Sequence, residues 1–501
     1  MARRPKKSKY DVIVIGAGMG GLSAATFLVQ EGYSVLVLER HYRAGGYAHS
    51  FRRKKFTFDS AVRIAAGAKD GGLLDELLEK AGVADEMDFI KLDEIYTAYY
   101  PDRKIEVSRT VDGLIQAYCE QFPHESENIK ALVHEMEQLY EVTLMLLHSG
   151  DPMKVLSNPY MLKYRNKTFH ELTSSFLQDP KAIYSFSALW AYYGTPPTQG
   201  GAMFFAYAIM SYFKEDIYYS KGSFQKLADV FVKRIQSLDG EVCLRNEVLK
   251  IEVEEKRVKG VHLQTGEYVE APMIVCNGDF LKMVHNLVGE ENFPVRYNKR
   301  IAKLKPSISA FEVFLGVDLP LEQYNISHET FIYNDYNYDQ FMDKHNRLNE
   351  LGPEGLSGLA ISTPTLADPS LAPEGKHTAV LTTLVPYNIE GGWKEQKEAY
   401  QDRLIKMAER AIPNLRDHIE HVESGTPLTM EHYTNNSYGS IYGWEQNNNQ
   451  MTGKPQHETP IKGLYISGQW TDPGGGVVSV ILSGYKLWKK IEKTANQKVS
   501  V

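Results

Sequence analysis

Cysteine is scarce in this chain of 501 residues: there are three, and they lie far apart. Cys119, Cys243 and Cys276 form no C-x-x-C pair and none of the spacings typical of a metal site. The sequence therefore predicts neither a disulfide framework nor a bound metal. Separate, unpaired cysteines are typical of a reducing compartment, so we expect a cytoplasmic protein.

Long apolar runs and an excess of basic residues are also missing. Gly200–Phe213, the longest apolar stretch, is shorter than the roughly 18–20 residues that span a bilayer, so it forms either core or an apolar entrance resting on a membrane. The basic start, MARRPKK, precedes no apolar run long enough for a signal peptide. This segment is either a solvated tail or a site that is weakly attracted to anionic lipid.

The net charge of the chain is −7, which argues against nucleic acid as the main partner. Nothing in the sequence fixes an oligomeric state.

What the sequence does have is two glycine-rich loops, one near each end of a chain long enough for at least two domains. The first loop, GAGMGG, starts at Gly16, between the β-branched run Tyr10–Ile15 and the helical pattern LSAATFLVQEG. A second strand, Ser34–Leu38, then leads to Glu39. This is the G-x-G-x-x-G fingerprint inside a βαβ unit, with an acid about 20 residues beyond it.

Each residue of the fingerprint has a physical task in dinucleotide binding. Gly16 makes the tight turn, Gly18 lets the backbone approach a pyrophosphate, and Gly21 lets helix and strand pack closely. The helix N-terminus offers free N–H groups and a partial positive charge to the anion. Glu39 is placed to accept hydrogen bonds from a ribose diol. The pattern predicts a Rossmann-type dinucleotide-binding domain.

The second loop lies in LYISGQWTDPGGGVV, near the far end of the chain. Gly463–Ser467 fits a short strand, Gly468 a turn, and Gly474–Gly476 the start of a helix near Val477. That helix N-terminus would direct its dipole at the pyrimidine edge of a flavin, where negative charge builds up on reduction. The two loops are thus expected to hold opposite ends of one cofactor. The alternative is a plain loop before a structural helix.

These motifs resemble those of a known family. GAGMGGLSAATFL, LERHYRAGG, FTFD, KGSFQKLAD, AFEVFLGVD, GSIYGWEQ and KGLYISGQWTDPGGGV are similar to segments of the phytoene desaturase, carotenoid isomerase and retinol saturase family of FAD-dependent oxidoreductases, which have the amine oxidase-like flavoprotein fold. The E-x5-GG extension from Glu39 to Gly45 and Gly46 belongs to this resemblance, and simple NAD dehydrogenases usually lack it. The resemblance implies non-covalent FAD as the cofactor.

An α/β protein with two domains is implied. Residues 1–81, 222–280 and 425–501 would form a discontinuous Rossmann-type FAD-binding domain. Residues 82–221 and 281–424 would form an α+β substrate domain whose helical part faces a membrane or the interior. The resemblance assigns FAD binding to Gly16, Gly18, Gly20, Gly21, Glu39, Arg40, Gly45, Gly46, Tyr47, Ala48, Val62, Arg63, Val248, Gly468, Gln469, Gly475, Gly476 and Val477.

Two positions depart from the family's pattern. Many relatives carry an acid directly after the glycine of the C-terminal strand, where Gln469 stands here, although an amide also hydrogen-bonds a hydroxyl or phosphate. The GG-Arg of many desaturases and amine oxidases is GG-Tyr47 here, and Gly45–Phe51 instead resembles the GGxxHxF of retinol saturases. This slightly favours isomerisation or saturation over desaturation.

The sequence contains few recognisable catalytic motifs. The sequence contains no H-E-x-x-H and no G-x-S-x-G, and His418-Ile-Glu-His421 fits an exposed helical face better than a metal site. The lack of such motifs is consistent with a flavin enzyme, because the flavin carries the redox chemistry while the protein positions the substrate. Candidates near the flavin ring are His49, Arg63, Glu431, Tyr442 and Trp444.

Three segments predict either an apolar pocket or an inter-helical core. Ala131–His148 has helical apolar spacing, whereas Ser187–Pro197 and Ala202–Tyr219 are dense in aromatic and methionine residues. We therefore expect an FAD-dependent oxidoreductase that acts on carbon–carbon double bonds of a long apolar polyene (carotenoid, retinoid or polyketide-like). Desaturation, saturation and redox-neutral cis/trans isomerisation all stay open. The alternatives are a flavin amine oxidase and a non-enzymatic lipid-binding escort on the same fold.

Overall fold

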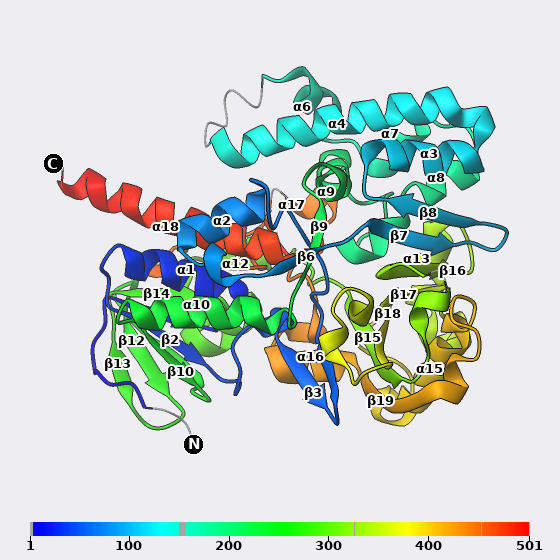
Figure 1. The fold of residues 1–501 in the computed structure, drawn as a ribbon. Helices are drawn as coiled ribbons and strands as arrows, with labels where there is room; N and C mark the ends of the chain where they lie inside the picture. Colours follow the sequence, from blue (N-terminus) through cyan, green and yellow to red (C-terminus); the bar gives the residue numbers. More distant parts are fainter. Residues whose placement is uncertain (1–3, 150–156, 325, 452, 500–501) are drawn as a thin grey trace.

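A computed structural model of the chain describes residues 4–149, 157–324, 326–451 and 453–499. Two large β-sheets organise these residues, one parallel and one mixed, with a layer of helices above the mixed sheet (Figure 1). The first three residues of the basic tail lie outside the described residues. Within the described part, no helix combines the length and the apolar character needed to cross a bilayer.

The parallel sheet is built from strands that are far apart in the sequence. Its order is β10-β2-β1-β14-β20, and every neighbouring pair runs parallel. Its strands are β1 (Val12–Ile15), β2 (Val35–Glu39), β10 (Glu241–Leu244), β14 (Met273–Cys276) and β20 (Leu464–Ile466). All five fall within the segments expected to form the FAD-binding domain, whose exact limits stay a prediction.

Strand β1 shows why this sheet is buried on both faces. The side chains of Val12 and Val14 pack into one hydrophobic cluster with helices α1 (Met19–Gln30) and α18 (Val477–Val499), whereas Ile13 packs into a second cluster on the opposite face. Successive side chains of a strand alternate between faces, so a continuous β-branched run suits a sheet covered on both sides. Both predictions for this unit, the strand near the N-terminus and the helix from Val477, are confirmed.

A small antiparallel sheet covers the second face. It consists of β11 (Val248–Glu254), β12 (Arg257–Leu263) and β13 (Tyr268–Glu270). The turn between β11 and β12 is formed by Glu255 and Lys256, both with positive φ, and Arg257 already belongs to β12.

The mixed sheet has seven strands in the order β19-β15-β18-β17-β16-β7-β8. All neighbouring pairs are antiparallel except β16 with β7. The strands are β7 (Glu94–Tyr99), β8 (Lys104–Ser108), β15 (Ser309–Val317), β16 (Glu329–Tyr333), β17 (Gly358–Ser362), β18 (His377–Val385) and β19 (Ile419–Gly425). The expectation of a helical face at His418-Ile-Glu-His421 is wrong, because β19 pairs with β15 and places His421 in a strand.

Helices gather above this sheet at the top of Figure 1. They are α3 (Val111–Gln121), α4 (Ser126–Ser149), α6 (Pro159–Tyr164), α7 (Phe169–Ser174), α8 (Pro180–Ser185), the 3-10 helix η4 (Ala188–Tyr193) and α9 (Ala202–Lys214). The predicted helical spacing of Ala131–His148 lies in α4, where Leu132, Met136 and Leu139 are fully buried. The side chains of Leu146 and His148 lie outside the described residues.

Shorter elements link these layers. A three-stranded sheet is formed by β5 (Ala65–Ala66), β9 (Ile217–Ser220) and β6 (Phe89–Lys91), and a hairpin by β3 (Ser50–Arg53) and β4 (Phe56–Asp59). Further helices are α2 (Leu73–Ala81), α10 (Gln225–Ser237), α11 (Phe280–Lys282), α12 (Val295–Ile301), α13 (Tyr338–Asn346), α14 (Leu348–Leu351), α15 (Gly392–Ala408), α16 (Pro427–Thr434) and α17 (Asn448–Met451).

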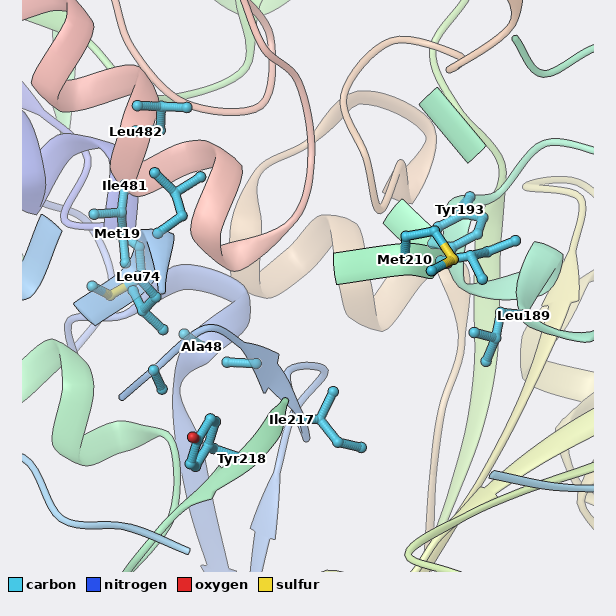
Figure 2. Packing of buried hydrophobic residues seen from close by; sticks show 14 of the residues in the cluster. Met19, Ala48, Leu74, Leu189, Tyr193, Met210, Ile217, Tyr218, Ile481 and Leu482 are labelled. Atoms are coloured by element: carbon cyan, nitrogen blue, oxygen red, sulfur yellow. The ribbon is translucent and has the colours of Figure 1, made fainter. Parts of the chain in front are cut away.

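One buried cluster joins the parallel sheet to the helical layer. Figure 2 shows part of it, with residues beside α1 and α18 on one side and residues of η4 and α9 on the other. The labelled members include Met19, Leu74, Ile481, Leu189, Tyr193 and Met210. The region around α1 and α18 and the region around η4 and α9 therefore share one continuous hydrophobic core.

Candidate active site

The two glycine loops lie side by side. Ser467 Oγ donates a hydrogen bond of 2.9 Å to the carbonyl oxygen of Gly20. A Cβ atom on Gly20 would lie 2.7 Å from the Cα of Gly468, so only glycine permits this approach. The contact joins residues more than four hundred positions apart, as the expectation of one shared cofactor requires.

The first loop leads into a helix N-terminus that has no side-chain cap. Gly16 has φ +97°, and a Cβ on Gly21 would overlap the carbonyl oxygen of Gly16, so the turn and the helix close tightly. Helix α1 has no side-chain N-cap and no acid in its first turn. Its first N–H groups and its dipole are therefore available to an anion.

Glu39 fixes this loop from the end of β2. One carboxylate oxygen accepts the backbone N–H of Ala17 at 2.7 Å, and the other accepts that of His41 at 2.7 Å. Burial raises the pKa of Glu39 above its usual value, and the two N–H donors oppose that shift. Glu39 therefore shapes the loop in addition to the ribose contact, which stays a prediction.

The E-x5-GG extension lies against the same loop. The backbone N–H of Gly45 donates to the carbonyl oxygen of Ala17 at 2.8 Å, and Gly18 and Gly45 form a parallel bridge. His49 Nδ1 lies 2.7 Å from the carbonyl oxygen of Gly46, and burial lowers the pKa of His49 to about 4. His49 is therefore neutral at physiological pH, and its Nδ1–H donates to Gly46.

The second loop presents another open helix N-terminus. Helix α18 begins at Val477 and has no acid in its first turn. A Cβ on Gly475 would lie 2.9 Å from the Cα of Tyr442, so the loop packs against backbone on one side and faces a cavity on the other. Two helix N-termini, neither with an acid in its first turn, thus face the same space.

That space is a cavity of about 640 Å³, a size typical of ligand pockets. It runs from the glycine loops into a region walled by α4, α6, η4, α9 and the mixed sheet, which we call the apolar chamber. The predicted FAD-binding residues that line the cavity are Gly16, Gly18, Gly20, Glu39, Gly45, Gly46, Tyr47, Ala48, Val62, Arg63, Gln469, Gly475, Gly476 and Val477.

Helix α9 resolves the choice between core and pocket for its segment. One face, including Phe205, Ile209 and Met210, is buried in the core, whereas Tyr207 and Ala208 line the chamber. The other chamber walls come from Thr143 and Leu147 of α4, Met161 of α6, and Ala191, Tyr192 and Tyr193 of η4. The aromatic and methionine-rich segments therefore supply both core and pocket.

A polar cluster interrupts this apolar wall. Arg63 Nη2 and Glu312 Oε1 are 2.6 Å apart, with side chains only 7% and 3% exposed. Thr382 Oγ1 donates to Glu312 at 3.2 Å. Beside this pair, Glu329 accepts hydrogen bonds from the hydroxyl of Tyr192 and, at 2.7 Å, from Ser362; these six side chains all line the cavity.

The two carboxyl groups of the cluster differ in their charge balance. Burial raises the pKa of Glu312, and the Arg63 guanidinium opposes that shift through a direct ion pair. Burial raises the pKa of Glu329 to about 7, against weaker opposition from Tyr192, Ser362 and the more distant Arg63. Glu312 is therefore the ionised partner of Arg63, and Glu329 titrates near neutrality.

Of the five candidates near the flavin ring, the structure brings three to the cavity and leaves two elsewhere. His49, Arg63 and Tyr442 line it. Glu431 instead contacts Lys282 at 3.0 Å and Tyr387, beside a separate small pocket, because the half-buried ammonium group of Lys282 attracts its carboxylate there. Trp444 is fully buried, and its Nε1 donates to the carbonyl oxygen of Trp470 at 2.9 Å, so it is a core residue.

Four predicted FAD-binding residues do not line the cavity. Gly21 and Gly468 act one layer behind it, by allowing the close approaches described above. Arg40 donates to the carbonyl oxygen of His432 at 2.9 Å, and Val248 is buried at the start of β11. For Arg40 and Val248 a contact with FAD stays a prediction.

Glu312 and Glu329 are functional candidates that sequence reasoning missed. Each is a single acid in a short run of otherwise apolar or β-branched residues, AFEVFLGV and ETFIY. A carboxylate is seldom fully buried without a purpose, so an acid inside a predicted buried strand was the available signal. Nothing in the local pattern revealed that both acids face Arg63.

The model of the flavin-containing amine oxidoreductase family matches residues 19–486. The chain belongs to that family. It is a flavin-dependent oxidoreductase with the amine oxidase-like α/β fold, as the sequence predicted. Family membership therefore favours an enzyme over a non-enzymatic escort protein. The fold alone does not distinguish these two alternatives.

Curated relatives cover nearly the whole chain at moderate identity. A prolycopene isomerase from an Oncidium hybrid is 29% identical over 95% of this chain and 82% of its own length. An all-trans-retinol 13,14-reductase from Danio rerio is 24% identical over 92% and 82%, and a lycopene-forming phytoene desaturase from Paracoccus is 24% identical over 94% of both. The predicted family resemblance is thereby confirmed.

Solved structures agree on the fold. An oxidoreductase from Methanosarcina mazei superimposes with a TM-score of 0.67 at 18% identity, covering 96% of this chain and all of its own. A putrescine oxidase bound to putrescine also gives 0.67, at 14% identity, covering 97% and 99%. At such identities the likeness concerns architecture only.

The residues present fit a flavin. Gly18, Gly20, Gly475 and Gly476 leave room along the cavity wall, and two helix N-termini without an acid in their first turns would present their dipoles to phosphate and to the ring edge. His41 lines the same wall, and its buried Nε2 has no hydrogen-bond partner among the described residues. These groups would hold the cofactor along the glycine end of the cavity.

Proposed function

We propose that this oxidoreductase uses non-covalently bound FAD to act on carbon–carbon double bonds of a long apolar polyene. The observation that carries the proposal is the single cavity, which joins the glycine loops to the apolar chamber. A bound flavin supplies two-electron redox chemistry. The chain's own residues hold the cofactor, align an apolar chain beside it and exclude water.

The dinucleotide form of the flavin is supported by the fingerprint loop. FMN has no pyrophosphate to occupy the N-terminus of α1 and no adenosine ribose for Glu39 to contact. None of Cys119, Cys243 and Cys276 lines the cavity of the described part, so no thiol is placed to bind the ring covalently. Acid denaturation of purified protein should release all of its flavin, and the released flavin should be FAD; FMN or protein-bound flavin would contradict this part.

An apolar substrate is supported by the chamber walls. Leu147, Met161, Tyr207 and Ala208 offer aliphatic and aromatic contacts, and such surfaces favour hydrocarbon over water by about 25 cal/mol per Å². Relatives named as a prolycopene isomerase, a retinol reductase and a phytoene desaturase support the substrate class without choosing among three reactions.

Anaerobic incubation with candidate polyenes separates these reactions. Bleaching of the oxidised flavin with loss of two hydrogens from the polyene indicates desaturation. A product that gains two hydrogens after prior reduction indicates saturation, and a geometric isomer without net redox change indicates isomerisation. The proposal fails if the FAD-loaded protein gives no spectral change and no product with carotenoid, retinoid and polyketide polyenes.

Amine oxidation is the second candidate, and the buried acids favour it. Glu312 and Glu329 face only one guanidinium, so a substrate ammonium ion could balance the second carboxylate. The apolar chamber argues for the polyene instead. Rapid bleaching by small amines such as putrescine, with no response to polyenes, would select the amine oxidase.

We also propose that the protein works in the cytoplasm, at a membrane surface that holds its substrate. Met145 of α4 and Leu162 of α6 are 46% and 56% exposed, and they neighbour the chamber residues Leu147 and Met161. Exposed apolar side chains beside an apolar cavity suit an entrance for lipid-dissolved molecules. Cosedimentation with liposomes should decrease when both exposed residues are changed to serine; unchanged binding would contradict the proposal.

A further inference from the structure

The cluster of Arg63, Glu312 and Glu329 carries more acid than base. Arg63 and Glu312 form an ion pair at 2.6 Å, which neutralises both. Glu329 is 1% exposed, and the only ion pair recorded for it among the described residues is with His328, at 3.5 Å. A buried carboxylate without a counter-ion is costly, so Glu329 retains a proton unless something stabilises its anion.

His328 does not supply the missing charge. Its Nε2 lies 3.1 Å from the carbonyl oxygen of Arg63, a distance at which the Nε2–H donates. Burial lowers the pKa of His328 to about 4, so the ring is neutral at physiological pH. Two phenols also face Glu329, those of Tyr192 and Tyr212, and burial raises the pKa of both, so they stay protonated.

The same surroundings can also hold Glu329 as an anion. The hydroxyls of Tyr192 and Ser362 both donate to its Oε2, and the Arg63 charge lies nearby. Desolvation thus favours the acid, and two donors with one cation favour the carboxylate. A group balanced between the two forms is suited to exchange a proton during turnover.

Glu329 is also connected to the loop expected at the pyrimidine edge of the flavin. The hydroxyl of Tyr442 donates to the carbonyl oxygen of Tyr192, and Tyr442 packs against Gly475. The contacts Gly475–Tyr442–Tyr192–Glu329 therefore run from the C-terminal glycine loop to the carboxyl. They place Glu329 where the glycine end of the cavity meets the chamber, within the wall of both.

We propose that Glu329, held by Tyr192, is the residue that exchanges a proton with substrate carbon. The inference rests on the proposed function. In the saturating direction the carboxyl O–H bond would break and the π electron pair of the double bond would form the new C–H bond with that proton. A bound reduced flavin would supply the hydride that the neighbouring carbon needs. Glu329 is left as a carboxylate stabilised by Tyr192 and Ser362, and a proton from water restores it. Desaturation is the reverse sequence.

Glu135 provides a matched control in the same protein. It too is a carboxylate that accepts a tyrosine hydroxyl, from Tyr164 at 2.6 Å, but Lys163 balances its charge at 2.8 Å. Although burial pushes the pKa of Glu135 up, those two donors bring it below the usual value. Glu135 lies outside the cavity lining.

The test compares Glu329→Gln with Glu135→Gln in the FAD-loaded protein. We expect Glu329→Gln to lower polyene turnover about 100-fold with flavin content unchanged, because general acid catalysis contributes about 10²–10⁴-fold, and Glu135→Gln to leave turnover unchanged. Turnover of the reduced protein in D₂O should place deuterium on the product carbon that Glu329 protonates, and Tyr192→Phe should shift the pH optimum. Turnover of Glu329→Gln within twofold of the unchanged protein would overturn the proposal.

An infrared titration separates this inference from the proposed function, because it needs no substrate. Between pH 5 and 9 the protein should show a protonated-carboxyl band that disappears near neutrality and is absent from Glu329→Gln but present in Glu135→Gln. If the band behaves so while no polyene is turned over, the proposed function fails, and the assignment of Glu329 as a carboxyl that titrates near neutrality is still supported. If polyenes are turned over and the band is missing, the inference fails alone.

Discussion

The glycine end of the cavity and the apolar chamber are built by opposite means. At the glycine end the contacts come from backbone: the turn at Gly16, the open first turns of α1 and α18, and the N–H groups held by Glu39. In the chamber they come from side chains on η4, α4, α9 and four strands of the mixed sheet. A site built from backbone depends on local spacing, whereas a site built from side chains depends on which elements meet.

The first prediction tests the backbone end with the largest expected effect. In Gly21→Val the new Cβ overlaps the carbonyl oxygen of Gly16, and neither group can move without breaking the turn. We expect a loss of roughly 3 kcal/mol or more in the free energy of unfolding, with no retained flavin. Thermal denaturation and the flavin-to-protein absorbance ratio measure both.

Gly32→Ala is its control. Gly32 also has positive φ, +87°, but no atom lies within 4 Å of an added Cβ, so only backbone strain of about 1 kcal/mol is expected. A stable, yellow Gly21→Val protein would show that the close approach of helix and turn is dispensable.

The second prediction concerns the chamber and its dependence on pH. The folded protein binds the Glu329 proton more tightly than the unfolded chain, since the pKa rises from 4.5 to about 7. The resulting stability is complete below about pH 4.5 and is lost as pH rises through about 7, amounting to about 3 kcal/mol. In urea denaturation from pH 5 to 8, the free energy of unfolding of the unchanged protein should fall by about 2.5 kcal/mol more than that of Glu329→Gln. The same pH dependence in both proteins would show that Glu329 does not titrate in this range.

The third prediction returns to the glycine end. Glu39→Ala removes the acceptor of two backbone N–H groups and the expected ribose contact. Hydrogen bonds to a charged group contribute about 2 kcal/mol, so flavin affinity should fall roughly 30-fold. Fluorescence titration of the flavin-free protein measures the affinity. Glu39→Gln, which keeps one acceptor, should lie between, and unchanged yellow absorbance after extensive dialysis would refute the role.

The fourth and smallest prediction narrows the chamber alone. Ala208 lines the cavity from α9, and Ala208→Phe should raise the KM for a long polyene about 10-fold, equivalent to about 1.4 kcal/mol, with flavin content unchanged. Val295→Phe, on the exposed surface of α12, should leave the KM unchanged. Loss of flavin in Ala208→Phe would show that flavin binding at the glycine end depends on the shape of the apolar chamber.

The family and the parallel sheet were predictable because their signals are local. The run before Gly16, the spacing to Glu39 and the GGG before Val477 each specify a strand, a turn or a helix start within a few residues, and the structure contains all of them. Gly21 and Gly468 were recognised as essential positions, although they act behind the cavity wall.

The candidate catalytic side chains were poorly predictable, because neighbouring residues in the sequence do not determine which groups these side chains contact. Glu431 and Trp444 stand in family-like or C-terminal segments, yet one pairs with Lys282 and the other fills the core. Glu329 stands in an unremarked strand, yet it meets Tyr192 and Ser362 at the cavity. Burial and charge pairing, not sequence neighbourhood, set these roles.

By itself, the sequence determined where the chain turns tightly and where helices expose their N-termini, because glycine spacing and β-branched runs constrain φ and ψ within a few residues. Only the tertiary structure decided which acids share one guanidinium and which face of α9 meets the cavity. Those outcomes depend on strands and helices hundreds of residues apart, whose contacts arise from packing the whole core and are encoded in no single segment.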